Sequence, residues 1–295
     1  MEPWVVLAVA AAGAQSLRFA LQKALSADGL SPVASTWARF LWSAPLIAVL
    51  LGGWLAVTGQ AFPRPDAVFL GWAILGGACQ IFATICVVAL FRTRAFAIGI
   101  TFKKTEVLLT ALAGFLLLGD RLTAGALGAV ALGFLGVALL SRRPGTTEID
   151  GRAVALGLGS GAFFALSAVG YRGATLALDA DGTLVRAGAA LLMVTTGQAL
   201  ALFLWLWARD RAQVGLTLGA WRRGLLTGVT SLAGSWCWFA AFSLANAALV
   251  FAVGQIELIF SLALGAWWFR ERVGAREIAG MAVLTVSILG VVALA

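Results

Sequence analysis

Short polar breaks divide the chain into ten apolar runs of about 18 to 25 residues, each long enough for an α-helix to cross the hydrocarbon core of a bilayer. Lipid offers no partner to backbone N–H and C=O groups, so a spanning segment must satisfy them internally, as a helix does. The runs also lack the apolar and polar alternation of membrane barrel strands. We therefore predict an all-α integral membrane protein with ten transmembrane helices. Their expected ranges are 4–25, 33–57, 67–91, 95–118, 123–140, 152–175, 184–208, 224–244, 247–269 and 274–294.

The composition excludes most soluble functions. Of the 295 residues, 61% are hydrophobic and 12% are charged, a balance typical of membrane proteins. Histidine is absent, which removes the commonest metal ligand and general base, so we expect no metal site and no serine-hydrolase chemistry. The net charge of +8 comes from basic residues at helix ends rather than from a basic domain, so no nucleic-acid partner is expected. No nucleotide-binding motif is present, and no cofactor is expected.

The sequence around residues 105–122 recurs at an offset of 151 residues, which brings Glu106 onto Glu257. The other informative matches are Gly114 with Gly265, Asp120 with Glu271, Arg121 with Arg272 and Cys86 with Cys237. Such matches in one register predict a duplicated chain. The expected units are a first five-helix repeat at 1–142, a linker at 143–151 and a second five-helix repeat at 152–295. Five is an odd number, so the second copy enters the membrane from the opposite face, and we predict two inverted repeats around a central cavity.

Arginines predict the orientation in the membrane. When the loops are numbered in order, the odd loops and their edges hold twelve arginines, whereas the even loops hold two, Arg64 and Arg121. Cytoplasmic loops carry the excess of basic residues. We therefore expect the odd loops in the cytoplasm and both termini outside, in a membrane of the bacterial inner-membrane type.

Three ionisable residues fall inside the run at 95–118, namely Lys103, Lys104 and Glu106. Lys103 and Glu106 are three residues apart and can pair on one helix face, while Lys104 points about 100° away from them in a regular helix. One interpretation is that the lysines snorkel from a helix end to the membrane surface. The other is that Glu106 and its repeat mate Glu257 face one cavity, with the lysines adding positive charge from one side.

Glu257 has no basic residue within a turn of its own helix, since Gly254 and Gln255 stand where the first repeat has the two lysines. An isolated buried carboxyl group holds a proton more readily than a paired one. We therefore expect Glu257 to be the titrating group and Glu106 to be half of a charge pair with Lys103.

Further polar residues lie at membrane depth. Gln15 and Gln80 can bond a neighbouring helix or a ligand, and Arg39 and Arg186 either snorkel or contact substrate. Trp238 is an interior aromatic residue, suited to core packing or to stacking on a substrate. The candidate substrate-binding or coupling residues are thus Glu106, Glu257, Lys103, Lys104, Gln255, Gln15, Gln80, Trp238 and Arg39, with no catalytic or metal residue.

Small residues four apart predict close helix packing at four places. They are Gly157 with Gly161, Gly224 with Gly228, Ala124 with Gly128, and Ala129 with Gly133.

The chain resembles the ten-helix EamA-type branch of the drug/metabolite transporter superfamily. The resemblance rests on the segments LLLGDRL at 116–122 and WWFRERV at 267–273, each followed by a helix ending in FLGVALL or ILGVVAL. Family members commonly carry a proline in the middle of the fourth and ninth helices, whereas this chain has Val107 and Leu258 there, which puts a helix break in doubt. The spacing of Lys103 and Glu106 also resembles the Lys-x-x-Glu of sugar-phosphate translocators, which hints at an anionic substrate. Ten-helix members usually have cytoplasmic termini, and the arginine distribution predicts the reverse here.

The resemblance implies a secondary active transporter, and not an enzyme, that moves a small polar or amphipathic metabolite by alternating access. The expected substrates include anions and amino acids or related compounds. Transport is expected to be driven by a proton gradient or by exchange with another substrate. The expected partners are this small molecule, protons and membrane lipid. The protein is expected to work as a monomer. An intramembrane enzyme and a scaffold or receptor stay open as alternatives. We expect a Glu257→Gln variant to fold but lose gradient-driven transport, and Lys103→Ala to lose affinity for an anionic substrate.

Overall fold

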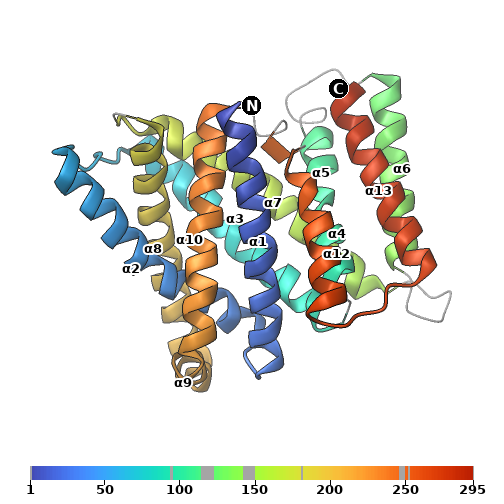
Figure 1. Ribbon diagram of the computed structural model, residues 1–295, viewed down its shortest axis with the longest axis horizontal. Coiled ribbons are helices and arrows are strands. Elements are labelled where there is room, and N and C mark those ends of the chain that lie inside the picture. The colour runs from blue at the N-terminus through green and yellow to red at the C-terminus, as the bar shows by residue number, and fades with distance from the viewer. Residues whose placement is uncertain are drawn as a thin grey trace.

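The computed structural model describes residues 2–93, 96–113, 123–141, 150–180, 182–245, 250–251 and 253–294, and these residues form helices and short connections without strands (Figure 1). Most of the predicted linker at 143–151 lies outside these ranges. Gly114, Asp120 and Arg121, which the sequence pairs with residues of the second half, lie outside them as well.

The first half of the chain forms α1 (Pro3–Ala27), α2 (Pro32–Thr58), α3 (Ala67–Phe91), α4 (Phe96–Lys103), α5 (Thr105–Ala113) and α6 (Ala124–Ser141). The second half forms α7 (Gly151–Ala177), α8 (Thr183–Arg209), α9 (Arg211–Gly219), α10 (Trp221–Leu244), the 3₁₀ turn η2 (Gly254–Ile256), α12 (Glu257–Trp267) and α13 (Ala275–Leu294). Capping side chains start several of them. Ser31, Asp66 and Asp150 each accept a hydrogen bond from the backbone N–H three residues later, at the start of α2, α3 and α7.

The structure confirms a helical membrane protein, with boundaries close to those predicted. Six helices, α1, α2, α3, α7, α8 and α10, are long and apolar enough to cross a membrane, and shorter apolar helices cover 254–267 and 278–287. Two predicted spans are interrupted, at Lys104 and at 254–256. The short helix α9 was not expected, because its nine residues are too few to span a bilayer and read as part of a loop.

Helices distant in sequence pack in pairs. α1 lies against α10, α3 against α7, and α6 beside α13 at one end of the molecule, with α2 and α8 at the other end (Figure 1). α1 begins and α13 ends at the same edge of the molecule in this view. Large apolar side chains point outward, including Val57, which is 87% exposed, and Val49, which is 73% exposed. An exposed apolar surface of this kind fits lipid as the surrounding solvent.

Glycines bring several helices into close contact. A Cβ built on Gly161 would lie 2.2 Å from Thr105 Oγ1, and one on Gly157 would lie 2.4 Å from Phe102 Cδ1, so α7 packs closely on α4 and α5 as predicted. Gly224 and Gly228 likewise pack against Trp42 of α2. In α6 a Cβ on Gly133 would lie 2.4 Å from Leu108 Cδ1, as predicted, whereas the contact predicted at Gly128 is wrong, because a Cβ there would meet no described atom within 4 Å.

Candidate functional site

Glu106 and Glu257 each lie at the start of a helix that follows an interruption. α4 ends at Lys103 and α5 begins one residue after Lys104, where the backbone N–H is shared between two carbonyl groups of the preceding turn. Glu106 is in the first turn of α5, and Glu257 opens α12 directly after the 3₁₀ turn η2. The sequence left a break here in doubt because proline is missing, and the structure has the break without it. The partial positive charge of each new helix start favours a carboxylate.

Two lysines from the first break meet the two glutamates. Lys103 Nζ lies 3.1 Å from Glu106 Oε1 and 3.2 Å from Glu257 Oε2. Lys104 Nζ lies 2.6 Å from Glu257 Oε2 and 4.0 Å from Glu106 Oε1. All four residues are at most 2% exposed. We call Lys103, Lys104, Glu106 and Glu257 the Lys–Glu cluster.

The lysines do not snorkel to the surface, because their ammonium groups are buried among the carboxylates. Charges in a low-dielectric interior are tolerated when they are paired and hydrogen-bonded. Lys104 Nζ also donates to the Gly254 carbonyl group at 2.8 Å, which accepts from the Glu257 backbone N–H as well, so a lysine from the first interruption is bonded to the backbone of the second. In a regular helix Lys104 would point away from Lys103 and Glu106. In the structure the helix is interrupted at Lys104, and its ammonium group contacts Glu257.

Glu257 is not the isolated carboxyl group that was expected from the absence of a basic residue within a turn of its own helix. Both lysines reach it from another helix, and Gln15 Nε2 lies 3.2 Å from each of its carboxylate oxygens. The spacing of residues along one helix could not reveal contacts between two different helices. Glu257 is therefore the carboxylate at the centre of the cluster rather than an isolated one.

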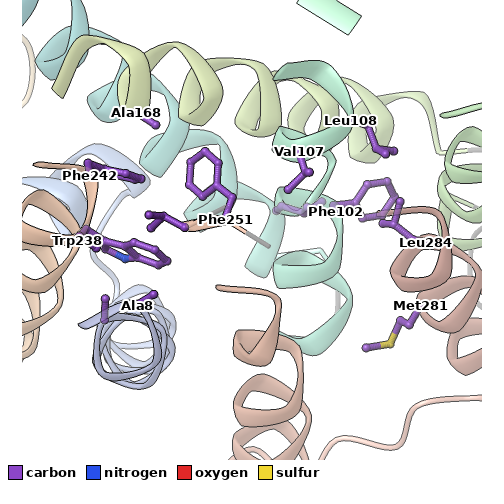
Figure 2. Close-up of a cluster of buried hydrophobic side chains, with 14 of the residues drawn as sticks. Ala8, Phe102, Val107, Leu108, Ala168, Trp238, Phe242, Phe251, Met281 and Leu284 are labelled. Atoms are coloured by element: carbon purple, nitrogen blue, oxygen red, sulfur yellow. The ribbon is translucent and has the colours of Figure 1, made fainter. Parts of the chain in front are cut away.

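Gln15 joins the Lys–Glu cluster to an aromatic group. Its amide oxygen accepts from Trp238 Nε1 at 3.2 Å and from Arg18 at 3.4 Å, while its amide nitrogen donates to Glu257. Trp238 stacks on Phe242, with ring centroids 5.7 Å apart, and meets Phe251 edge-on. Figure 2 shows these three aromatic side chains grouped beside Ala8 and Ala168. The predicted residues Gln15 and Trp238 thus lie together, next to the cluster.

Arg39 is buried, only 2% exposed, and its partners in the described part of the chain are hydroxyl groups. It donates to Ser231 at 2.8 Å, to Ser235 at 3.0 Å and to Thr84 at 3.3 Å. The snorkelling interpretation is therefore wrong for Arg39. Sequence reasoning missed Ser231 and Ser235, although their spacing of four residues places both on one face of α10.

Gln80 belongs to a second polar group. Its amide oxygen accepts from Tyr171 Oη at 2.6 Å and from Gln198 Nε2 at 3.2 Å. Two predicted residues stay apart from these contacts. Gln255 Nε2 donates to the Phe251 carbonyl group of its own segment, and Arg186 donates to the Ala180 carbonyl group at a helix end.

A cavity with about 390 Å³ of empty space, part of it open to solvent, connects these groups. Its polar lining comes from Gln15, Gln80, Lys103, Glu106, Ser167 and Ser235. Its aromatic lining comes from Phe164, Tyr171, Trp238, Phe239, Phe242 and Phe251. An apolar wall with a few convergent polar groups is the usual make-up of a small-molecule site.

Comparison with known proteins identifies the family. The EamA-like transporter family matches residues 151–293, the second half of the chain. No curated protein matches the chain significantly. One solved structure, titled "Crystal structure of protein", aligns with a TM-score of 0.57 over 99% of this chain and 94% of that one, at 16% identity, which indicates a shared fold alone. Residues 151–293, the second half of the chain, are therefore assigned to the EamA-like transporter family of the drug/metabolite transporter superfamily, a family of multi-pass membrane transporters.

Proposed function

We propose that the chain is a secondary active carrier of a small amphipathic metabolite, built from ten membrane-spanning segments and working by alternating access. The observation that carries this proposal is the buried Lys–Glu cluster at the edge of an amphipathic cavity. Ionisable groups at membrane depth are costly, and they mark substrate or ion pathways. A scaffold has no need of them.

Two inverted repeats, 1–142 and 152–295 with a linker between them, are supported by the pairing of helices. Under the offset of 151 residues, α1 corresponds to α7 and α3 to α10, so the packing of α1 on α10 corresponds to the packing of α7 on α3. α6 corresponds to α13, and these two helices pack on each other. The interruptions at Lys104 and Gln255 also correspond. Broken helices at a repeat interface, with the substrate site beside the breaks, are typical of such carriers.

We assign the coupling of transport to its driving gradient to the Lys–Glu cluster. Lys103 Nζ is nearly equidistant from Glu106 and Glu257, so a small helix movement exchanges one partner for the other. A gain or loss of one proton would leave a buried charge uncompensated, which costs several kcal/mol and favours a different arrangement of the helices. Protons or a counter-substrate can drive such a change. We place the protein in a bacterial-type inner membrane as a monomer with both termini outside, as the arginines predict.

An enzyme would require a nucleophile beside a base. Among the described residues the buried lysines contact carboxylates rather than a serine or cysteine, and this pairing favours transport over intramembrane catalysis.

The function is tested by filling the cavity. Ala168 lines it and is 4% exposed. We expect compounds found by thermal stabilisation of the purified protein in a metabolite panel to be transported in proteoliposomes, and an Ala168→Phe variant to lose both stabilisation and transport. Ala189, buried in α8 away from the cavity lining, offers Ala189→Ser as a control that keeps both. Equal stabilisation of the Ala168→Phe variant by the same compound would place binding elsewhere.

A further inference from the structure

The cavity region carries an excess of positive charge. Four buried cations, Arg18, Arg39, Lys103 and Lys104, accompany two buried carboxylates, Glu106 and Glu257. Each of the six is at most 2% exposed. The two lysines pair with the two glutamates. Among the described residues neither arginine forms an ion pair with a carboxylate, although Glu257 attracts Arg18 from a longer distance.

The two arginines have neutral partners. Arg39 donates to three hydroxyl groups, and Arg18 donates to the amide oxygens of Gln22 at 2.6 Å and Gln15 at 3.4 Å. Neutral acceptors satisfy guanidinium N–H groups but leave the charge uncompensated, which is costly in a low-dielectric interior. An anion within reach of these groups would supply the missing charge.

Ser235 connects Arg39 to the cavity. Its hydroxyl oxygen accepts from Arg39 at 3.0 Å, and the same residue lines the cavity. A hydroxyl group that accepts from a guanidinium keeps its own proton to donate, so Ser235 can donate to an anion in the cavity while it holds Arg39 behind it. Charge-assisted hydrogen bonds of this kind are stronger than neutral ones.

The aromatic part of the cavity lining suits an apolar, planar body. Trp238, Phe242 and Phe251 form mutual ring contacts with centroids 5.6 to 6.2 Å apart (Figure 2). A ligand ring beside them adds stacking contacts to the burial of apolar area. Both cluster carboxylates are already bonded to lysines, so a ligand ammonium group would have to break an existing ion pair.

We propose that the cavity binds a small organic carboxylate with an aromatic body, its carboxylate at Ser235 in front of Arg39 and its ring against Trp238, Phe242 and Phe251. The assignment rests on the proposed carrier function, because it names the cargo of that same cavity. The assignment predicts that the cavity binds organic anions more tightly than zwitterions and cations of the same size.

Four probes with the same ring separate these classes, namely 3-phenylpropionate, phenylalanine, phenethylamine and 3-phenylpropanol. With the purified protein in detergent micelles, calorimetry should show 3-phenylpropionate binding about tenfold or more tighter than the other three. Tighter binding of phenylalanine or phenethylamine, or binding by none of the four, overturns the assignment. Phenylalanine binding that Ala168→Phe blocks would overturn the anion assignment and leave the carrier proposal standing.

Variants of Arg39 and Ser235 test where the carboxylate of the ligand binds. We expect Arg39→Gln to weaken 3-phenylpropionate binding about tenfold or more, Arg39→Lys to weaken it less because the charge is kept, and Ser235→Ala to weaken it severalfold. Ser235→Ala removes only one hydroxyl group, so it tests the same binding site if Arg39→Gln does not fold. Arg223, an exposed arginine paired with Asp28, supplies the control Arg223→Gln, which should bind as the wild type does. Wild-type affinity in both Arg39→Lys and Ser235→Ala would overturn the proposal.

Discussion

A Glu257→Gln variant is expected to lose gradient-driven transport and also to become less stable. Glu257 is the carboxylate that contacts Lys104 at 2.6 Å and Lys103 at 3.2 Å, so its neutralisation leaves two buried ammonium groups to share Glu106. Breaking a buried ion pair costs about 3 to 5 kcal/mol. The measurements are the thermal unfolding of the purified variant and transport in proteoliposomes of a compound that stabilises the wild type.

The stability loss and the transport loss can be separated in a second variant. Combining Glu257→Gln with Lys104→Met removes one charge of each sign, so we expect the double variant to recover most of the lost stability and to stay inactive. Glu271→Gln is the matched control, because Glu271 pairs with Lys23 outside the cluster, where both side chains are partly exposed. It should keep transport. Full gradient-driven transport by Glu257→Gln would rule out coupling at this residue.

The second large effect is expected at the crossing of α3 and α7. A Cβ on Gly170 would lie 2.6 Å from both the N and the Cα of Gly76, which are backbone atoms and cannot turn aside. Gly170→Ala must therefore push the two helices apart, at a cost of about 2 to 3 kcal/mol that exceeds the helix propensity gained by replacing glycine. The measurement is the thermal unfolding temperature in detergent micelles.

Gly197 in α8 is the matched control. A Cβ there would meet no described atom within 4 Å, so Gly197→Ala should leave the unfolding temperature unchanged or raise it slightly. An equal response of Gly170→Ala and Gly197→Ala would contradict the close crossing of α3 and α7.

The sequence predicted the helical segments well because hydropathy decides them. In lipid, a long apolar run has few structures open to it, and segments such as 67–91 match α3 to the residue. The interruptions at Lys104 and 254–256 were harder to predict, since no proline marks them and one residue of irregular turn leaves the apolar pattern intact. The family resemblance was confirmed over the second half of the chain.

Within the site, sequence reasoning found residues but not their partners. Lys103 and Glu106 are three residues apart, and their pairing was predicted from that spacing and is present. The partners of Glu257 come from the end of α4, from Lys104 after it and from α1, at separations of more than 150 residues, which helical periodicity cannot reach. The hydroxyl groups around Arg39 were missed for the same reason.

The most direct test of the account asks whether one cavity residue is reached from both sides of the membrane. With Cys79, Cys86 and Cys237 replaced by alanine, a single Ala168→Cys would be treated with a membrane-impermeant thiol reagent in right-side-out and in inverted vesicles. Cysteines at Ala27, the last residue of α1, and at Gln60, in the connection after α2, mark the two sides, and the arginines predict Ala27 in the cytoplasm and Gln60 outside. Alternating access predicts that Ala168→Cys reacts in both preparations while each marker reacts in one. Reaction of Ala168→Cys from one side alone, or from neither, would contradict it.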